Sequence, residues 1–412
     1  MTGKPQTARE MGIMVGSPPP PDKRITHENW DSPPFNRWSF QHVREVLPTI
    51  NVSRGTGPVS PLAEANQDFN ALPVIHKRDG RKSTVMDTLI DTYTDGFIVI
   101  HNNEIVYERY MNDMTPSTLH LSQSVGKSVA ATVCGILIGR GEIDRNALVG
   151  DLIPELADSG YGDAPLQNVL DMRSGVKFGE TYTDPDSDIG KVDVAAGWKP
   201  MREGFPTAMQ DIPATLSKER EHGGDMQYRS IETDVMAWVM ERVTGKKLAQ
   251  LISEELWQPM GAEHDACFTV DRGGYALAEG GLNATMRDYA RFGLLYANNG
   301  RVGDQQLVPA EWVRETLQDG DMDAFKSYPS LSHFPRGAYK NQFWILDKDR
   351  QLIMARGVFG QAIYIDGLNN LVAVGLSTWP DFLNLEYLLD EIDMLEAITN
   401  ELTGNQTRIQ TG

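Results

Sequence analysis

Strand-like sequence lies near the two ends of this chain, with a helix-like middle between them. Apolar, β-rich runs occupy residues 97–110, 341–347, 351–366 and 370–379. The first run is interrupted by Asn102-Asn103, which predicts a hairpin from Phe97 to Tyr110. Between about 140 and 300, apolar residues recur every three or four positions, as they do in helices. This distribution predicts an α+β fold: one antiparallel sheet flanked by helices and built from both ends, with an inserted, mainly helical domain.

The predicted domain boundaries follow these changes in pattern. Residues 1–60 are rich in proline and polar residues, and we expect them to form an extended N-terminal arm over the surface. The sheet domain is expected from residues 61–140 and 300–412, and the mainly helical domain from residues 141–299. A length of 412 residues with 40% hydrophobic side chains is sufficient for a large core.

A Ser-x-x-Lys pair stands at the start of a predicted helix, in the sequence SQSVGKSVAATVCGILIGRG. Residues three apart share one face of a helix, so Lys127 can bring its amine to the hydroxyl of Ser124. The positive end of the helix disfavours a second positive charge, and Lys127 is therefore expected to be neutral and basic. Residues 129–138 are small or apolar except for Thr132, so this helix should be buried and hold Ser124 rigidly.

The letters GKS within this segment could also belong to a phosphate-binding loop. That loop needs a glycine five residues before its Gly-Lys-Ser, where this chain has Leu121. The preceding residues are polar, whereas a phosphate-binding loop follows a buried strand. We therefore favour a serine nucleophile with a lysine base.

Two further segments could complete such a site. A Ser/Lys pair needs a group that carries the proton to the leaving group, and Tyr228-x-Ser230 lies in a loop directly before an amphipathic helix. A backbone N–H must stabilise the oxyanion, and residues 355–366, ARGVFGQAIYID, fit an edge strand whose glycines allow close approach.

The sequence lacks the motifs of other hydrolase classes. The chain has neither a G-x-S-x-G nucleophile elbow nor H-E-x-x-H, so an α/β-hydrolase and a zinc hydrolase are disfavoured, and no metal or organic cofactor is expected. A net charge of −19 without a long basic run argues against nucleic-acid and membrane partners. Cys134 and Cys267 are expected to be free thiols, and no apolar signal segment is evident, so we expect a cytoplasmic protein.

The ordered segments SVGKS, LDMRSGVKFGETYTDP, MQYRSIETDVMAWVMERVTG, AEGG, RGVFGQAIYID and STWPD resemble the serine β-lactamase-like, or penicillin-binding-protein-like, family. The similarity is greatest to the nylon-oligomer hydrolases and carboxylesterases of that family, and it extends from about Trp30 to the final helix. The resemblance implies a β-lactamase/transpeptidase-like fold and a serine hydrolase that cleaves small amides or esters.

The same resemblance implies a role for individual residues. Ser124 is the acyl-accepting nucleophile, Lys127 its base and Tyr228 the proton shuttle, while the N–H groups of Ser124 and Val358 form the oxyanion hole. The implied substrate-binding positions are Tyr182, Glu180, Asp193, Trp198, Glu279, Ser230 and Phe343. The acids in this set predict a negatively charged cleft, which would prefer an amino or neutral substrate end to a free carboxylate.

Two departures from the family leave the substrate open. Glu279 stands where the nylon-oligomer hydrolases have Asn, and neither Lys nor His precedes Gly357, although Arg356 is adjacent. A carboxylesterase or an acyltransferase, in which an alcohol replaces water, is the alternative among enzymes. A binding protein that keeps the fold without catalysis is the alternative of another class. The expected partner is a small-molecule amide or ester, and the chain could form a homodimer.

Overall fold

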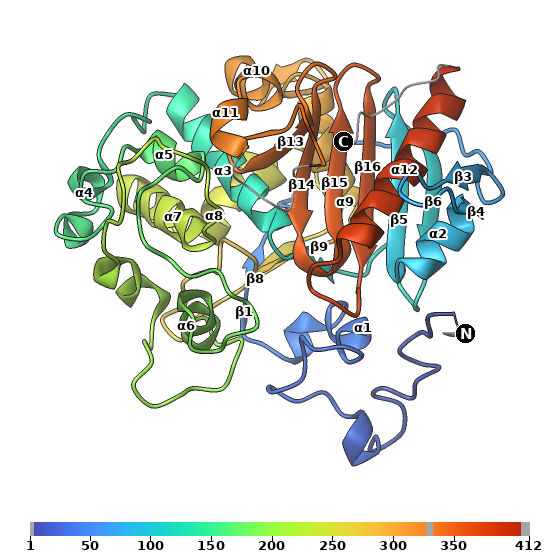
Figure 1. Cartoon of the computed structure of the whole chain (residues 1–412), viewed down its shortest axis with the longest axis horizontal. Helices are drawn as coiled ribbons and strands as arrows, with labels where there is room; N and C mark the ends of the chain where they lie inside the picture. The colour runs from blue at the N-terminus through green and yellow to red at the C-terminus, as the bar shows by residue number, and fades with distance from the viewer. Residues whose placement is uncertain (1–3, 327–332, 405–412) are drawn as a thin grey trace.

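An eight-stranded sheet forms the centre of the computed structural model, which describes residues 4–326 and 333–404 (Figure 1). Its strands lie in the order β12 (Ala338–Lys340), β13 (Phe343–Asp347), β14 (Leu352–Gly357), β15 (Gln361–Asp366), β16 (Leu371–Ser377), β5 (Thr94–His101), β6 (Glu104–Tyr110) and β2 (Ala63–Glu64). Neighbouring strands are antiparallel, except that β2 runs parallel to β6. The sheet therefore combines segments from both ends of the chain, as the sequence predicted.

Strands β5 and β6 form the hairpin that the sequence predicted. Asn102 and Asn103 at its turn have φ angles of 53° and 66°. A two-residue hairpin turn requires this left-handed conformation, which asparagine adopts more readily than most residues. Every residue of β5 is buried apart from His101, which is half-buried. The hairpin is thus confirmed, and it places a fully packed strand beside β16.

A second, four-stranded antiparallel sheet was not predicted. Its order is β1 (Thr49–Val52), β8 (Ala266–Thr269), β9 (Leu282–Ala284) and β7 (His120–Leu121). Strands of two to four residues are too short to produce an alternating pattern, so the expectation of a single sheet was wrong. This sheet joins the N-terminal arm to the segment directly before Ser124. Two-stranded ribbons pair β3 (Pro73–Ile75) with β4 (Lys82–Thr84), and β10 (Arg301–Val302) with β11 (Gln305–Gln306).

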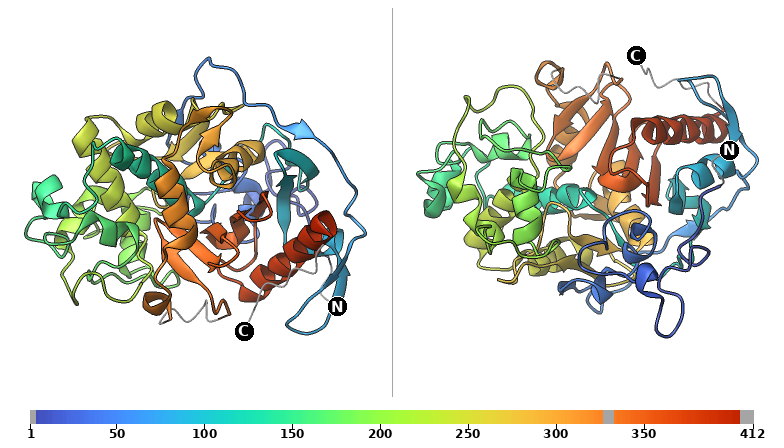
Figure 2. Two further views of the ribbon diagram at one scale, coloured as in Figure 1. Left: turned by 90° about the horizontal axis from the view of Figure 1, so that it is seen from above. Right: turned by 60° about the horizontal axis from the view of Figure 1, so that its bottom comes forward.

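Helices cover both faces of the eight-stranded sheet, as Figure 1 and Figure 2 show. The helices α3 (Val125–Gly139) and α9 (Met286–Ala297) share a core with one face, and α2 (Val85–Asp91) and α12 (Leu385–Thr403) share a core with the other. Although α9 lies in the range predicted for the helical domain, it packs directly on β15 and β16. Helix α9 thus belongs to the packing of the sheet, and the predicted domain boundaries stay predictions.

The mainly helical region lies beside the sheet (Figure 1). Its helices are α4 (Val149–Leu152), α5 (Leu166–Leu170), α6 (Asp188–Ala195), α7 (Ile231–Thr244) and α8 (Leu248–Ile252). The remaining helices are α1 (Asn36–Ser39), α10 (Ala310–Gln318) and α11 (Met322–Phe325). Helix α7 contacts both α3 and α5, so it links this region to the sheet. No helix within the described ranges is both long and apolar enough to cross a membrane.

The N-terminal arm is anchored by Trp30. Its side chain is fully buried, its ring packs edge-on against Trp198 at 5.1 Å between centroids, and its Nε1–H donates to the Trp198 carbonyl at 2.8 Å. Because an indole buries a large apolar area, this contact holds the arm against the helical region.

Helix α3 is buried from Val125 to Leu137, which confirms the prediction made from its apolar sequence. Gly135 allows the closest packing on this helix. A Cβ at Gly135 would come within 2.3 Å of the indole of Trp312 in α10. The glycine is therefore required by the approach of that ring.

We expect Gly135→Ala to destabilise the fold by about 1–3 kcal/mol, because the added methyl group has no room against Trp312. Alanine's better helix propensity, about 1 kcal/mol, offsets only part of this cost. Gly57→Ala is the control, since a Cβ at Gly57 meets no atom within 4 Å. Guanidinium unfolding measures both variants, and an unchanged free energy of unfolding for Gly135→Ala would contradict the packing described.

Candidate active site

Ser124 is presented by a sharp turn between β7 and α3. Gln123, directly before it, has a φ of 50°, a left-handed conformation that costs a non-glycine residue about 1–3 kcal/mol. Ser124 follows as the N-cap residue of α3, and its half-buried side chain lines a cavity. The turn and the buried helix together fix the position of the hydroxyl.

Lys127 lies one turn further along α3 and is only 1% exposed. Its Nζ donates to Ser124 Oγ at 2.9 Å and to the Glu279 carbonyl at 2.7 Å. The Glu279 carboxylate oxygen Oε2 lies 3.3 Å from the same nitrogen. An ammonium group has three N–H donors, so these acceptors satisfy all of them.

The surroundings of Lys127 favour its charged form. Burial lowers the pKa of Lys127, but the acidic groups around it, Tyr228, Glu279, Glu180 and Asp234, together raise this pKa above its usual value, and Tyr228 contributes only where its phenol has ionised. The direction of this pKa shift opposes the neutral Lys127 expected from the sequence. The helix N-terminus disfavours a cation as expected, but the acid at position 279 reverses the balance.

The segment that carries Glu279 is held by helix α7. Asp234 Oδ1 accepts a hydrogen bond from the Ala278 N–H, directly before Glu279, at 2.9 Å. Glu279 itself is 5% exposed. The Glu279 carbonyl, which accepts a hydrogen bond from Lys127 Nζ, is thus held in place by a side chain from the helical region.

Tyr228 completes the contact with Ser124 and Lys127 from the loop before α7. Tyr228 lines the same cavity as Ser124, and Lys127 Nζ lies 5.3 Å from the centre of its ring. Its ring stacks on Trp344 at 5.3 Å between centroids, with an interplanar angle of 17°. Burial raises the pKa of Tyr228, while the charge of Lys127 opposes that rise, so the phenol is the favoured form near neutrality.

Glu180 organises a second group of side chains at the same cavity. Its carboxylate accepts hydrogen bonds from the Ser230 N–H at 3.0 Å, from the Ser230 hydroxyl, and from the Tyr182 hydroxyl at 2.6 Å. Tyr182 in turn lies against Phe382, at 5.4 Å between ring centroids. Glu180 therefore ties the 180–182 segment to the start of α7.

Strand β14 comes close to Ser124 because its last residue is glycine. A Cβ at Gly357 would lie 2.4 Å from the Ser122 carbonyl oxygen and 3.0 Å from the Ser124 nitrogen. Val358 follows directly and lines the cavity. The backbone N–H groups of Ser124 and Val358 are thus carried by two segments that touch, as an oxyanion hole requires.

A cavity of about 590 Å³ opens beside Ser124. Its walls are formed by Ser124, Glu180, Thr181, Tyr182, Thr183, Gln227, Tyr228, Trp344, Arg356, Gly357, Val358, Phe382, Leu383 and Leu385. Five of the residues singled out from the sequence line it. Lys127 and Ser230 bond to the lining residues Ser124 and Glu180, and Glu279 lies behind Lys127. The sequence did not indicate Arg356, Trp344 or Phe382 as lining residues.

Three residues expected at the substrate lie elsewhere. Phe343 is fully buried and packs on Tyr296 at 4.6 Å, because alternation along β13 turns Phe343 to the core and Trp344 to the cavity. Trp198 donates from Nε1 to Thr269 Oγ1 at 2.9 Å and supports Trp30. Asp193, in α6, is also outside the lining, and burial raises its pKa well above the usual value.

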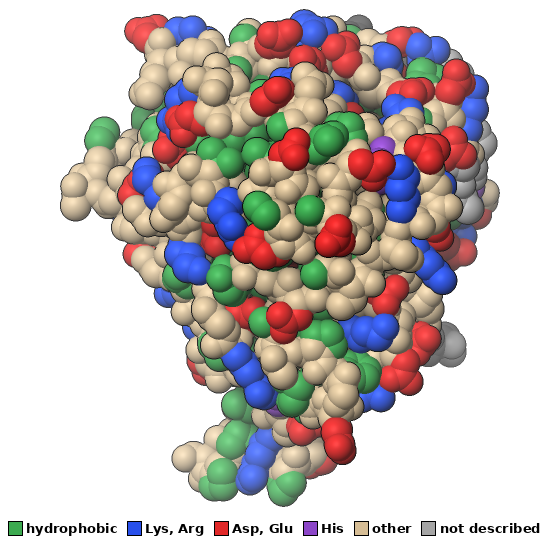
Figure 3. Space-filling model, turned by 90° about the vertical axis from the view of Figure 1, so that its left-hand side faces the viewer, with side chains coloured by type: hydrophobic (Ala, Val, Ile, Leu, Met, Phe, Trp, Pro, Cys, Tyr) green, Lys and Arg blue, Asp and Glu red, His purple; other side chains and the backbone are tan. Residues whose placement is uncertain are grey.

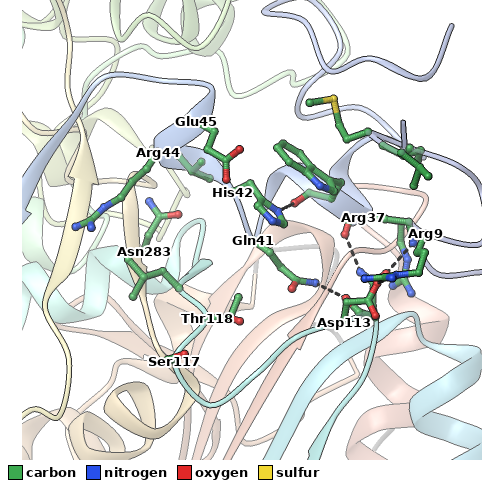
Figure 4. Close-up of a pocket in the computed structure, with 18 of the residues that line it drawn as sticks. Arg9, Arg37, Gln41, His42, Arg44, Glu45, Asp113, Ser117, Thr118 and Asn283 are labelled. Carbon is green, nitrogen blue, oxygen red and sulfur yellow. Dashed lines mark hydrogen bonds and ion pairs between the residues drawn. The ribbon is translucent and has the colours of Figure 1, made fainter. Parts of the chain in front are cut away.

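A larger cavity, of about 730 Å³, lies between the N-terminal arm and the body of the molecule (Figure 4). Its arginines already have partners: Arg9 bonds Asp113 at 2.9 Å, and Arg37 bonds Asp95 at 2.9 Å. None of its lining residues pairs a nucleophile with a base as Ser124 and Lys127 do. We therefore place the candidate active site in the smaller cavity, the one beside Ser124.

A serine, a buried lysine and a tyrosine in mutual contact beside a glycine-ended strand agree with the resemblance seen in the sequence. Residues 86–390 match the β-lactamase family. The chain belongs to this family. It is a serine hydrolase with the β-lactamase/transpeptidase-like fold, as predicted. Within the described residues, no group of three or more His, Cys, Asp or Glu side chains could hold a metal ion.

Similar proteins cover nearly the whole chain. The 6-aminohexanoate-dimer hydrolase of Paenarthrobacter ureafaciens is 35% identical over 376 residues, 91% of each chain. A solved structure from Bacillus anthracis, provisionally named 6-aminohexanoate-dimer hydrolase, has a TM-score of 0.85 and 27% identity over 95% of this chain and 100% of its own. A family VIII carboxylesterase shares the fold, with a TM-score of 0.57 and 18% identity over 76% of this chain and 96% of its own.

Glu279→Gln should move the acidic limb of the kcat/KM pH profile to lower pH. Removing the anion lowers the pKa of Lys127, so its neutral form becomes available at lower pH. Hydrolysis of a neutral p-nitrophenyl ester across the pH range measures this change. Glu241→Gln is the control, because Glu241 is a half-buried acid on α7 that is not among the charges acting on Lys127. A limb that stays in place, or moves to higher pH, would contradict the assigned charge.

Proposed function

We propose that the protein cleaves small linear amides or esters through an acyl-Ser124 intermediate. The observation that carries the proposal is the 2.9 Å contact between Lys127 Nζ and Ser124 Oγ, with Tyr228 beside Lys127 in the same cavity. A nucleophile is activated when a base holds its proton at this distance. The pattern of residues is a Ser-x-x-Lys motif.

The reaction begins from a form that has lost one proton from the Lys127–Tyr228 pair. Ser124 Oγ attacks the carbonyl carbon while its proton passes to Lys127. Tyr228 delivers a proton to the leaving nitrogen or oxygen, the bond to the carbonyl carbon breaks, and the acyl group remains on Ser124. Water then attacks the ester, its proton follows the reverse path, and a carboxylic acid leaves.

The oxyanion that develops in both steps is assigned to the N–H groups of Ser124 and Val358. The close approach of Gly357 to the Ser124 backbone supports this assignment. Loss of one such donor typically costs about 10²–10³ in kcat. Two donors on fixed backbone need no reorganisation as the charge forms.

The substrate class is inferred from the cavity and from the relatives. Its walls include the apolar side chains of Trp344, Phe382 and Leu383, which suit an aliphatic chain. The Paenarthrobacter relative is named for a dimer of 6-aminohexanoate, and we propose amides of comparable length for this chain. Esters of the same shape use the same intermediate, and an alcohol in place of water would give acyl transfer.

We also propose a cytoplasmic location, because Cys134 and Cys267 are both free and buried. Acidic and basic side chains are interspersed on the face drawn in Figure 3, and the net charge is −19, which supports a small-molecule partner rather than nucleic acid. A homodimer stays a prediction.

Ser124→Ala should lower kcat for a p-nitrophenyl ester or a linear amide by about 10³-fold or more, because no other nucleophile shares this base. Ser128→Ala, which removes a hydroxyl that donates to the Gln342 carbonyl, is the control on the same helix. Circular dichroism confirms that each variant is folded. More than about one per cent residual activity in folded Ser124→Ala would refute the assignment of the nucleophile.

Lys127→Ala should be nearly as damaging as Ser124→Ala, and Tyr228→Phe less damaging. The lysine accepts the proton of the attacking hydroxyl, whereas water could replace the tyrosine in part as proton donor to the leaving group. Single-turnover kinetics with an ester and an amide separates these roles. Departure of an amine leaving group from the amide depends more on protonation than departure of the alcohol from the ester. The reverse order of severity would make Tyr228 the base.

A further inference from the structure

Two charged side chains line the cavity beside Ser124 among the described residues, Glu180 and Arg356. Glu180 is occupied by three hydrogen bonds from Ser230 and Tyr182. Its carboxylate is therefore part of the wall and has little capacity left for a ligand. Arg356 is the charge that remains available.

The side chain of Arg356 has no hydrogen bond or ion pair with any other residue in the described part of the chain. The side chain of Arg356 is half-buried. Its backbone lies near the end of β14 and pairs with that of Ala362 in β15. Other half-buried arginines have a partner within the protein: Arg350 has Asp366 at 3.0 Å and Arg145 has Glu315, whereas Arg220 bonds a backbone carbonyl. A guanidinium without a protein partner keeps its N–H donors available to a ligand that enters the cavity.

Glu391, whose pKa is affected by the charge of Arg356, does not neutralise this guanidinium. Among the charges acting on Glu391 of α12, that of Arg356 is the largest, yet the two groups form no ion pair. Burial raises the pKa of Glu391 to about 8, so its carboxyl group is largely protonated near neutral pH. Arg356 therefore contributes a net positive charge to a cavity whose walls are mostly apolar.

The position of Arg356 relative to the reacting atoms is favourable for substrate recognition. It immediately precedes Gly357 and Val358, which approach the backbone of Ser124. A group bound by Arg356 would thus lie along the same cavity as a carbonyl held at Ser124. Trp344 and Phe382 line the space and can cover the aliphatic part of such a ligand.

We propose that Arg356 binds a carboxylate at one end of the substrate, so that the enzyme prefers linear amides or esters that carry a free carboxylate. A planar guanidinium binds a carboxylate through two parallel N–H···O bonds. This preference is the opposite of the one expected from the acids Asp193 and Glu279, which lie outside the cavity lining. The inference rests on the proposed function for its catalytic readout.

Two matched pairs of substrates test the preference. Mono(4-nitrophenyl) adipate and its methyl ester differ in charge on the acyl side, and N-hexanoyl-6-aminohexanoate and its primary amide differ on the leaving-group side. The wild-type kcat/KM should favour the carboxylate in at least one pair by roughly 10-fold or more, the effect expected of a charge-assisted bidentate contact.

Arg356→Gln should reduce that ratio to about threefold or less, and Arg356→Lys should keep part of it, because lysine retains the charge without the bidentate geometry. Each ratio compares two substrates on one protein, so a lower fraction of folded enzyme cancels. Arg301→Gln removes one positive charge from an exposed hairpin and should keep the full preference. No carboxylate preference in either pair, or a preference unchanged in Arg356→Gln, would overturn the proposal.

A binding measurement separates this proposal from the proposed function. Calorimetric titration of Ser124→Ala with both matched pairs compares affinities without turnover. Tighter binding of the carboxylate in at least one pair, lost in Ser124→Ala/Arg356→Gln, supports the anchor even if the wild type hydrolyses none of the compounds. Equal affinities within both pairs would overturn the anchor even if the wild type hydrolyses all of them.

Discussion

The buried charge of Lys127 is the constraint on which the site depends. Removing an ammonium group from water costs several kcal/mol unless hydrogen bonds and opposite charge replace the lost hydration. The Ser124 hydroxyl, the Glu279 carbonyl and the Glu279 carboxylate supply that replacement. The lysine thus holds the nucleophile and the 278–281 segment together, and Asp234 extends the connection to α7.

The sheet contributes the other half of the site through close backbone approach. Gly357 brings the end of β14 against residues 122–124, which no larger residue would permit without displacement. The helical region supplies Tyr228, and the 180–182 segment supplies the wall that faces it. Chemistry therefore occurs where three parts of the chain meet, and each part is fixed by polar contacts to the others.

The sequence predicted the parts of this arrangement that depend on local pattern. The apolar run after Ser124 indicated a buried helix, Asn102-Asn103 indicated a hairpin, and Ser-x-x-Lys indicated a shared helix face. The charge of Lys127 could not be predicted locally, because it depends on Glu279, which is 152 residues away. The four-stranded sheet was missed because its strands are too short for a period to be visible.

The sequence also did not predict which side chains face the cavity. Phe343 and Trp344 are adjacent aromatic residues on one strand, and only the register of β13 decides which of them faces the cavity. Arg356 was visible in the sequence, but the absence of a partner for it is a three-dimensional property of the described structure. Local chemistry thus identified the nucleophile, and the tertiary contacts determine what its cavity can bind.

Covalent labelling with a fluorophosphonate, followed by peptide mass mapping, tests most directly whether Ser124 is the activated nucleophile. The probe reacts with a serine whose hydroxyl is activated by a neighbouring base. We expect one adduct on the peptide of residues 110–127, at Ser124, with labelling lost in Ser124→Ala and slowed strongly in Lys127→Ala. An adduct on a different residue, or equal labelling of the wild type and Ser124→Ala, would contradict the account.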